Sequence, residues 1–83
     1  MKTVIGGNTK LTWQDEFPKV TDCTHCGKKA RIALTSRETG RGKQVCDLHQ
    51  NREDKKFWPH DCIAFSLYFC EKCAKPTVLA NQA

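Results

Sequence analysis

The sequence predicts a small, mainly β fold: an antiparallel sheet with a polar insert between two of its strands. Three observations support this prediction. The chain has 83 residues, of which 39% are hydrophobic, against roughly 45–50% (a figure that also counts Gly) in ordinary domains. Chains near this length often need a disulfide or a metal in addition to a core. Six cysteines are present, and the two clearest strand patterns each adjoin a Cys-x2-Cys pair.

We expect one domain spanning 1–83, because the chain is shorter than most domains. A large enzyme cavity or a Rossmann or P-loop fold does not fit so short a chain. The composition divides it into an N-terminal β-like arm (1–22), a first cysteine knuckle with a strand (23–35), a basic insert (36–61), a strand with a second knuckle (62–75) and a tail (76–83).

Two segments carry the alternation of a half-buried strand. In 29–35 one face is apolar, and it consists of Ala30, Ile32 and Leu34. In 62–69 large apolar residues alternate with small or polar ones, and the large ones are Ile63, Phe65, Leu67 and Phe69. If these strands pair antiparallel, both knuckles lie at one end of the sheet and the insert leaves from the other.

The remaining elements rest on shorter patterns. The β-like runs Thr3–Ile5 and Lys10–Trp13 flank Gly6-Gly7-Asn8, which predicts a hairpin. A short helix is predicted in the insert, beginning near Asp47. The tail after Pro76 forms either a last helical turn or a loose end.

The four cysteines of the knuckles have the spacing of metal ligands. Cys23 and Cys26 form one pair, and Cys70 and Cys73 form the other. Gly27 suits the left-handed turn that often follows such a pair. Four thiolates match a closed structural Zn²⁺ site, although the 43 residues between the pairs exceed the roughly 15–20 of the compact pattern.

The N-terminus favours metal over disulfides. Disulfides need an oxidising compartment, and a secretory signal needs an apolar run of about 7–15 residues. Here only Val4 and Ile5 follow the first lysine before glycines and polar residues. No stretch approaches the roughly 20 apolar residues of a membrane helix. We therefore expect a cytoplasmic protein without membrane contact.

These features resemble the zinc-ribbon family. The likeness rests on Cys23-Thr-His-Cys26-Gly27-Lys28 with its strand, and on Cys70-Glu-Lys-Cys73 with the strand before it. It covers about 23–35 and 62–75. The chain departs from the family at Ala74, where Gly is frequent, and in its long insert. The resemblance implies a zinc-finger type of structural site and no particular role, since many functions share this fold.

Iron is the alternative ion, because tetrahedral sulfur ligation suits both metals. The cysteine pairs look somewhat like those of rubredoxins, but neither knuckle carries a proline between its cysteines. An electron carrier or a thiol redox protein using the same pairs therefore stays open beside a zinc protein.

A candidate second metal site involves the other two cysteines. Cys46-x2-His49 and His60-x-Cys62 have ligand spacing, and together they supply four ligands. Cys62 and Cys70 cannot share an ion, because eight strand residues span roughly 26 Å. We favour a nested arrangement, in which these four residues bind one ion at the end of the sheet away from the knuckles. In the crossed alternative, the first knuckle shares an ion with His60 and Cys62, and the second knuckle shares one with Cys46 and His49. The structural alternative is that the cysteines are small buried hydrophobes and the histidines lie on the surface.

The insert is the candidate contact surface. The formal charge of +5 lies within residues 28–56, which hold nine basic and four acidic residues. Such a segment could contact nucleic acid or a protein, or be only a solvated face. The candidate contact residues are Arg37, Arg41, Lys43, Arg52, Lys55, Lys56 and Trp58.

We expect no enzymatic activity and no small-molecule substrate. Ser66 lacks an elbow motif, and no metal pair has an open position with a nearby glutamate. A His60–Cys62 dyad lacks a third group. The glycines lack the spacing of a phosphate loop.

Overall fold

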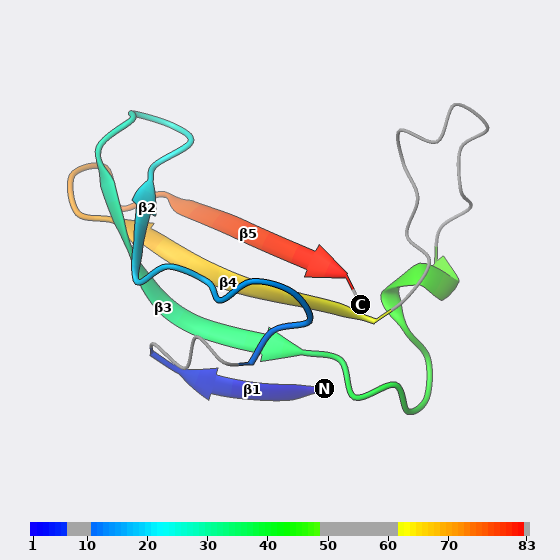
Figure 1. Ribbon diagram of the computed structural model, residues 1–83. Coiled ribbons are helices and arrows are strands. Elements are labelled where there is room, and N and C mark those ends of the chain that lie inside the picture. The colour runs from blue at the N-terminus through cyan, green and yellow to red at the C-terminus, as the bar shows by residue number, and fades with distance from the viewer. Residues whose placement is uncertain (7–10, 49–61, 83) are drawn as a thin grey trace.

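The computed structural model describes residues 1–6, 11–48 and 62–82, which form one open antiparallel sheet (Figure 1). Its five strands are β1 (Lys2–Ile5), β2 (Val20–Asp22), β3 (Lys29–Arg37), β4 (Ile63–Cys70) and β5 (Pro76–Gln82). A 3-10 turn, η1 (Val45–Leu48), follows β3. The small, mainly β fold is confirmed. The predicted short helix, from near Asp47 to Lys56, lies almost wholly outside the described residues, and its first two positions belong to η1.

Strand β3 is the centre of the sheet. One of its edges pairs antiparallel with β4, from Ala30 opposite Cys70 to Arg37 opposite Ala64. Along the other edge, the first part of β3 (29–31) pairs with β2, and the last part (34–37) pairs with β1. Strand β5 extends the sheet beyond β4. The predicted antiparallel pairing of the two strands is therefore confirmed, and the insert leaves the sheet at the end away from the knuckles (Figure 1).

A β-bulge interrupts β3 where β2 gives way to β1. The register with β4 shifts between Ile32 and Leu34. The carbonyl of Ala33 accepts a hydrogen bond of 2.6 Å from the Gly6 amide. The extra residue sends Leu34 to the face opposite Ile32 and brings Thr35, which is fully buried, to the Ile32 face. The predicted facing was thus wrong for Leu34 and Thr35, because strict alternation cannot include a bulge.

One face of the sheet is covered by residues 11–19, which cross it between β1 and β2 (Figure 1). Leu11 and Phe17 are buried there. The buried Tyr68 hydroxyl donates to the Pro18 carbonyl at 2.6 Å, and the Trp13 amide donates to Asn81 Oδ1 at 3.2 Å. The β4 residues on this face are Ala64, Ser66, Tyr68 and Cys70, and all four are buried. The alternating residues Ile63, Phe65, Leu67 and Phe69 therefore lie on the opposite face.

The other face is only partly covered by the described residues. Along β4, Ile63, Phe65 and Leu67 are half-buried and Phe69 is exposed. The neighbouring strands add exposed apolar residues to it, Val78 from β5 and Ile5 from β1. The result is a continuous apolar strip across the sheet.

Two local predictions were wrong. The tail is strand β5, because Thr77, Val78 and Leu79 continue the sheet beside β4, and β-branched residues favour such pairing over a helical turn. The N-terminal hairpin is not formed: β1 pairs with β3, and residues 11–13 form no strand. A longer partner strand outcompetes a local hairpin that could bury little.

Candidate metal centre

The first knuckle is the turn of the β2–β3 hairpin. The Cys23 amide donates to the Lys28 carbonyl at 2.7 Å, and the Gly27 amide donates to the Cys23 carbonyl at 2.9 Å. Gly27 has φ +75°, a left-handed conformation that glycine adopts without a steric penalty. The strand ladder thus runs directly into a tight turn that presents Cys23 and Cys26.

The second knuckle repeats this construction as the turn of the β4–β5 hairpin. The Cys70 amide donates to the Lys75 carbonyl at 3.2 Å, and the Ala74 amide donates to the Cys70 carbonyl at 3.1 Å. Ala74 has φ +60°. The departure from the zinc-ribbon pattern therefore leaves the turn intact, although an alanine there carries backbone strain.

A short repeat in the sequence, which was not among the predictions above, signals this equivalence. Residues 23–28 and 70–75 both read Cys-x2-Cys, then a small residue, then Lys. Aligned this way, the two segments predict the same turn for both knuckles. His25 lies within the first of them, is exposed, and is not part of the cysteine cluster.

The four knuckle sulfurs converge at one point. All four Sγ atoms lie within 4.8 Å of one another. Cys23 and Cys73 have their sulfurs 3.7 Å apart, and Cys26 and Cys70 have theirs 3.4 Å apart. A disulfide would need about 2.05 Å, whereas a tetrahedral ion with bonds of about 2.3 Å needs sulfurs about 3.8 Å apart. The predicted ligands therefore form a cluster whose spacing fits a metal ion.

Backbone amides prepare part of the cluster for negative charge. The His25 amide donates to Cys23 Sγ at 3.3 Å and, with a smaller contribution from the Cys26 amide, lowers the pKa of Cys23 to about 6. The amides of Cys73 and Lys72 donate to Cys70 Sγ at 3.4 and 3.3 Å and lower the pKa of Cys70. These amides offset charge that four thiolates would place on the ion.

Cys26 behaves in the opposite way. A hydrogen bond from the Lys28 backbone lowers its pKa, but the neighbouring Cys70 sulfur and burial together outweigh it and raise the pKa to about 11. In the metal-free protein, Cys26 therefore keeps its proton at neutral pH, while Cys23 is largely a thiolate. Four adjacent sulfurs cannot all be charged until a cation joins them.

Contacts behind the sulfurs join the two knuckles. The Thr24 amide donates to Thr77 Oγ1 at 3.1 Å, which ties the first knuckle to β5. The Glu71 amide donates to the Lys29 carbonyl at 3.1 Å. Arg31 also forms an ion pair with the Glu71 carboxylate and lowers its pKa. The cluster is held in place by both hairpins.

The other predicted site residues that the structure describes lie at the opposite end of the sheet or on β3. Cys46 is half-buried in η1, and Cys62 is buried immediately before β4. The Arg37 guanidinium lies 4.7 Å from the centre of the Trp13 ring, so this arginine already has a partner within the chain. Residues outside the described part of the chain are His49, His60, Arg52, Lys55, Lys56 and Trp58.

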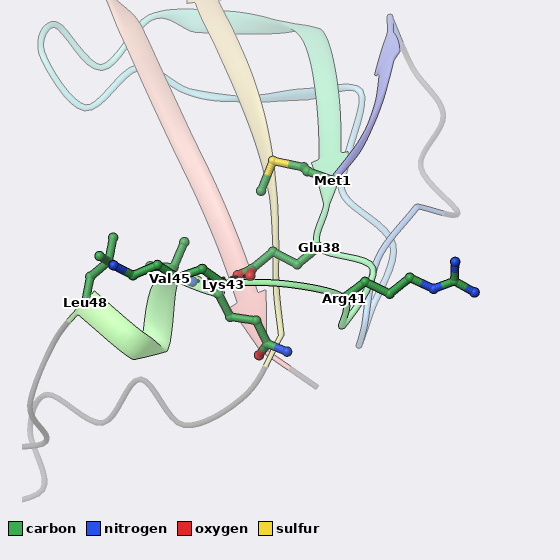
Figure 2. A pocket seen from close by; sticks show the side chains of 7 residues that line it. Met1, Glu38, Arg41, Lys43, Val45 and Leu48 are labelled. Carbon is green, nitrogen blue, oxygen red and sulfur yellow. Dashed lines mark hydrogen bonds between the residues drawn. The ribbon is translucent and has the colours of Figure 1, made fainter.

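Arg41 and Lys43 are exposed in the loop after β3. They border a cavity of about 240 Å³ beside Glu38 (Figure 2). Arg41 extends away from Glu38 in this view. These two cations are therefore presented to solvent, as a contact surface requires.

The described residues contain no helix that is long and apolar enough to cross a membrane. Comparison with protein-family models, curated proteins and solved structures gives no match to this chain. The likeness to zinc ribbons therefore rests on the antiparallel sheet and on the cluster of Cys23, Cys26, Cys70 and Cys73.

Proposed function

We propose that the protein is a binding module whose fold is held by one structural Zn²⁺ at Cys23, Cys26, Cys70 and Cys73. The observation that carries this proposal is the mutual approach of the four sulfurs to within 4.8 Å. An ion there would join the tips of two hairpins that already pair through β3 and β4 and whose chain connection runs through the long insert. Four thiolates leave no open position, which is the signature of structural rather than catalytic zinc. We accordingly propose no enzymatic role.

The proposed contact surface is the basic insert. Its described cations Arg41 and Lys43 are exposed, and residues 36–61 hold six basic and five acidic residues, while Lys28, Lys29 and Arg31 precede the insert. The open apolar strip that includes Phe69 and Val78 supports contact with a protein, since such strips are uncommon on monomers. Contact with nucleic acid is the alternative, and its signature is steep salt dependence.

Metal analysis tests the first part of this proposal. The purified full chain should be colourless and contain zinc, and a strong chelator should abolish its cooperative unfolding transition. A full native circular dichroism signal in the metal-free protein would reject structural zinc. Binding to mixed-sequence DNA and RNA at low and at physiological salt tests the second part. Absence of binding at low salt would eliminate nucleic acid and leave a protein partner.

The alternative function is iron-based electron transfer or thiol redox chemistry at the same cysteines. Visible absorption of the purified protein, or a reversible disulfide between Cys23 and Cys26, would favour it. A colourless protein that retains zinc under air would reject it. The cytoplasmic location that we propose, where thiols stay reduced, agrees with zinc.

A further inference from the structure

Strand β5 forms one border of the sheet (Figure 1). Within the described part of the chain it pairs only with β4, along its whole length from Pro76 to Gln82. An edge strand presents a row of backbone N–H and C=O groups to which another strand can bind. The composition and geometry of β5 therefore decide whether this edge is protected or is available for pairing.

The opposite border of the sheet has features that prevent pairing with another chain. Strands β1 and β2 have only four and three residues and carry a charge at one end, at Lys2 and at Asp22. The β3 bulge separates them. Short strands, bulges and charges are the means by which proteins protect sheet edges. Strand β5 instead has seven residues, none of them charged, in a chain with 28% charged residues. Its proline, Pro76, stands at the first position, where an edge strand tolerates it.

The hydrogen-bond ladder with β4 determines which backbone groups of β5 point outward. The Cys70 amide donates to the Lys75 carbonyl at 3.2 Å, so these two residues form a hydrogen-bonded pair. Opposite residues in an antiparallel ladder alternate between hydrogen-bonded and non-hydrogen-bonded pairs. Val78 and Ala80 lie three and five positions after Lys75, in a ladder without a register shift. Their N–H and C=O groups therefore point away from β4, toward the outer edge of the sheet.

The side chains of the same two residues are apolar and exposed. Val78 is 54% exposed, and Ala80 is also exposed. They lie opposite Leu67 and Phe65 of β4, on the face that carries the apolar strip. The middle of β5 thus offers outward backbone groups and apolar side chains at the same positions.

The end of β5 is bound within the chain. The Asn81 side-chain oxygen accepts a hydrogen bond from the Trp13 amide at 3.2 Å. The Gln82 carbonyl accepts one from Gln14 Nε2 at 2.6 Å. A pairing partner would therefore be centred on the middle of the strand rather than on its end.

From this arrangement we propose that β5 pairs antiparallel with β5 of a second copy of this chain, which joins two sheets into one. In the register that places Leu79 opposite Leu79 of the second copy, Val78 lies opposite Ala80 of that copy, and Ala80 lies opposite its Val78. The outward N–H and C=O groups then complete a hydrogen-bonded pair on each side of a twofold axis. The exposed side chains of Val78 and Ala80 contact each other in both pairs.

The features of β5 favour a second copy over an unrelated peptide. The pairing is self-complementary, because an uncharged strand meets an uncharged strand and each outward donor faces an outward acceptor. The apolar strips of both copies also continue on one face of the joined sheet. An edge that recognises a foreign peptide uses side-chain pockets for specificity, whereas the cavity described above borders η1 rather than β5. This pairing goes beyond the metal centre and does not depend on the identity of its ion.

The test is sedimentation velocity of the full metal-loaded chain from micromolar to millimolar concentration. A contact of this size is small, so the association should depend on concentration, with the mass rising from 9.4 kDa toward twice that value. Val78→Lys places a charge at the pairing site and should keep the protein monomeric. The matched control is Val20→Lys, because Val20 is also exposed, at 36%, but lies on β2 at the other border. A monomeric wild type at millimolar concentration, or equal association of Val78→Lys and wild type, would overturn the proposal.

Residue-resolved hydrogen exchange of the wild type does not depend on the folding of a variant. When nine-tenths of the chains are paired, the Val78 and Ala80 amides should exchange about tenfold more slowly than at low concentration, because exchange follows the unpaired fraction. The Thr77 and Leu79 amides face β4 and should be protected at both concentrations. Rapid exchange of Val78 and Ala80 in a dimer, or their protection in the monomer or only with a different protein, would contradict the pairing. Zinc content of the same samples tests the metal centre separately, so failure of either proposal is distinguishable.

Discussion

The left-handed residues of the two knuckles allow a sharp test of the metal centre. Gly27 and Ala74 occupy equivalent positions with φ +75° and +60°. We predict that Gly27→Ala weakens the centre and that Ala74→Gly strengthens it. A Cβ on Gly27 would meet nothing within 4 Å, so the effect of the substitution reduces to backbone strain.

The magnitude follows from two opposing contributions. A left-handed alanine costs about 1–2 kcal/mol, and replacing glycine restricts the unfolded chain, which returns about 0.4–1 kcal/mol. The net loss for Gly27→Ala is therefore about 1 kcal/mol, and Ala74→Gly should gain a similar amount. If the knuckles order only when metal binds, each change appears as roughly a fivefold shift in metal affinity, since 1.4 kcal/mol is tenfold.

The assay is competition with a chromophoric chelator, with thermal unfolding of the metal-loaded protein alongside. Gly42→Ala is the matched control, because Gly42 also has φ +73° and nothing within 4 Å of a built Cβ, yet it lies outside the knuckles. It should lower the unfolding temperature of the metal-loaded protein by a similar amount, and its affinity shift measures the part that comes from fold stability rather than from the knuckle turn. Equal affinities for wild type, Gly27→Ala and Ala74→Gly would refute the role of these turns in binding.

Three further predictions follow from the same structure. Chelation should unfold the protein, because structural zinc contributes about 10–16 kcal/mol, as large as the stability of a whole domain; a retained cooperative transition by calorimetry would contradict this. Metal affinity should rise at least about tenfold per pH unit from pH 7 to 9. Cys26, whose pKa is raised to about 11, must lose its proton to bind, whereas the Cys23 thiol is already largely deprotonated, and each released proton contributes tenfold. Titration in two buffers of different ionisation enthalpy counts the released protons, and a count of zero would refute the prediction. Glu38→Ala should lower the free energy of unfolding by about 3 kcal/mol, because the part-buried amides of Val45 and Ile63 lose a charged acceptor. The exposed Glu71→Ala should change it little, and equal losses for the two variants in denaturant titrations would contradict the bridging role of Glu38.

The sequence predicted the elements whose signals are local. Alternation along β4 and the spacing of Cys70 and Cys73 lie within a few residues of each other, and the antiparallel pairing with β3 then follows from where the knuckles must meet. The four ligands of the first centre were predictable for this reason, because a chelating pair constrains its own geometry.

The parts that sequence reasoning missed depend on distant partners. The bulge at Ala33 exists because β1 and β2 share one edge of β3 and meet there, and nothing local marks it. The pairing of β1 likewise depends on a strand about 30 positions away, so the apparent hairpin signal of Gly6-Gly7-Asn8 was misleading. β5 was missed because its short pattern supports a strand only once β4 is beside it.

The position of the knuckles at hairpin tips has a consequence for how the chain assembles. The β2–β3 and β4–β5 hairpins each close through a short turn, so each forms from contacts near in sequence, which is fast. Docking β3 against β4 instead requires closure across residues 38–62, and that entropy must be lost before the strand contacts form. An ion captured by the two tips would bring both hairpins into register in one event. Metal availability would then set the rate of folding as well as the stability of the folded state. The rate-limiting step would be the encounter between the hairpin turn that already holds the ion and the hairpin turn that supplies the other two cysteines.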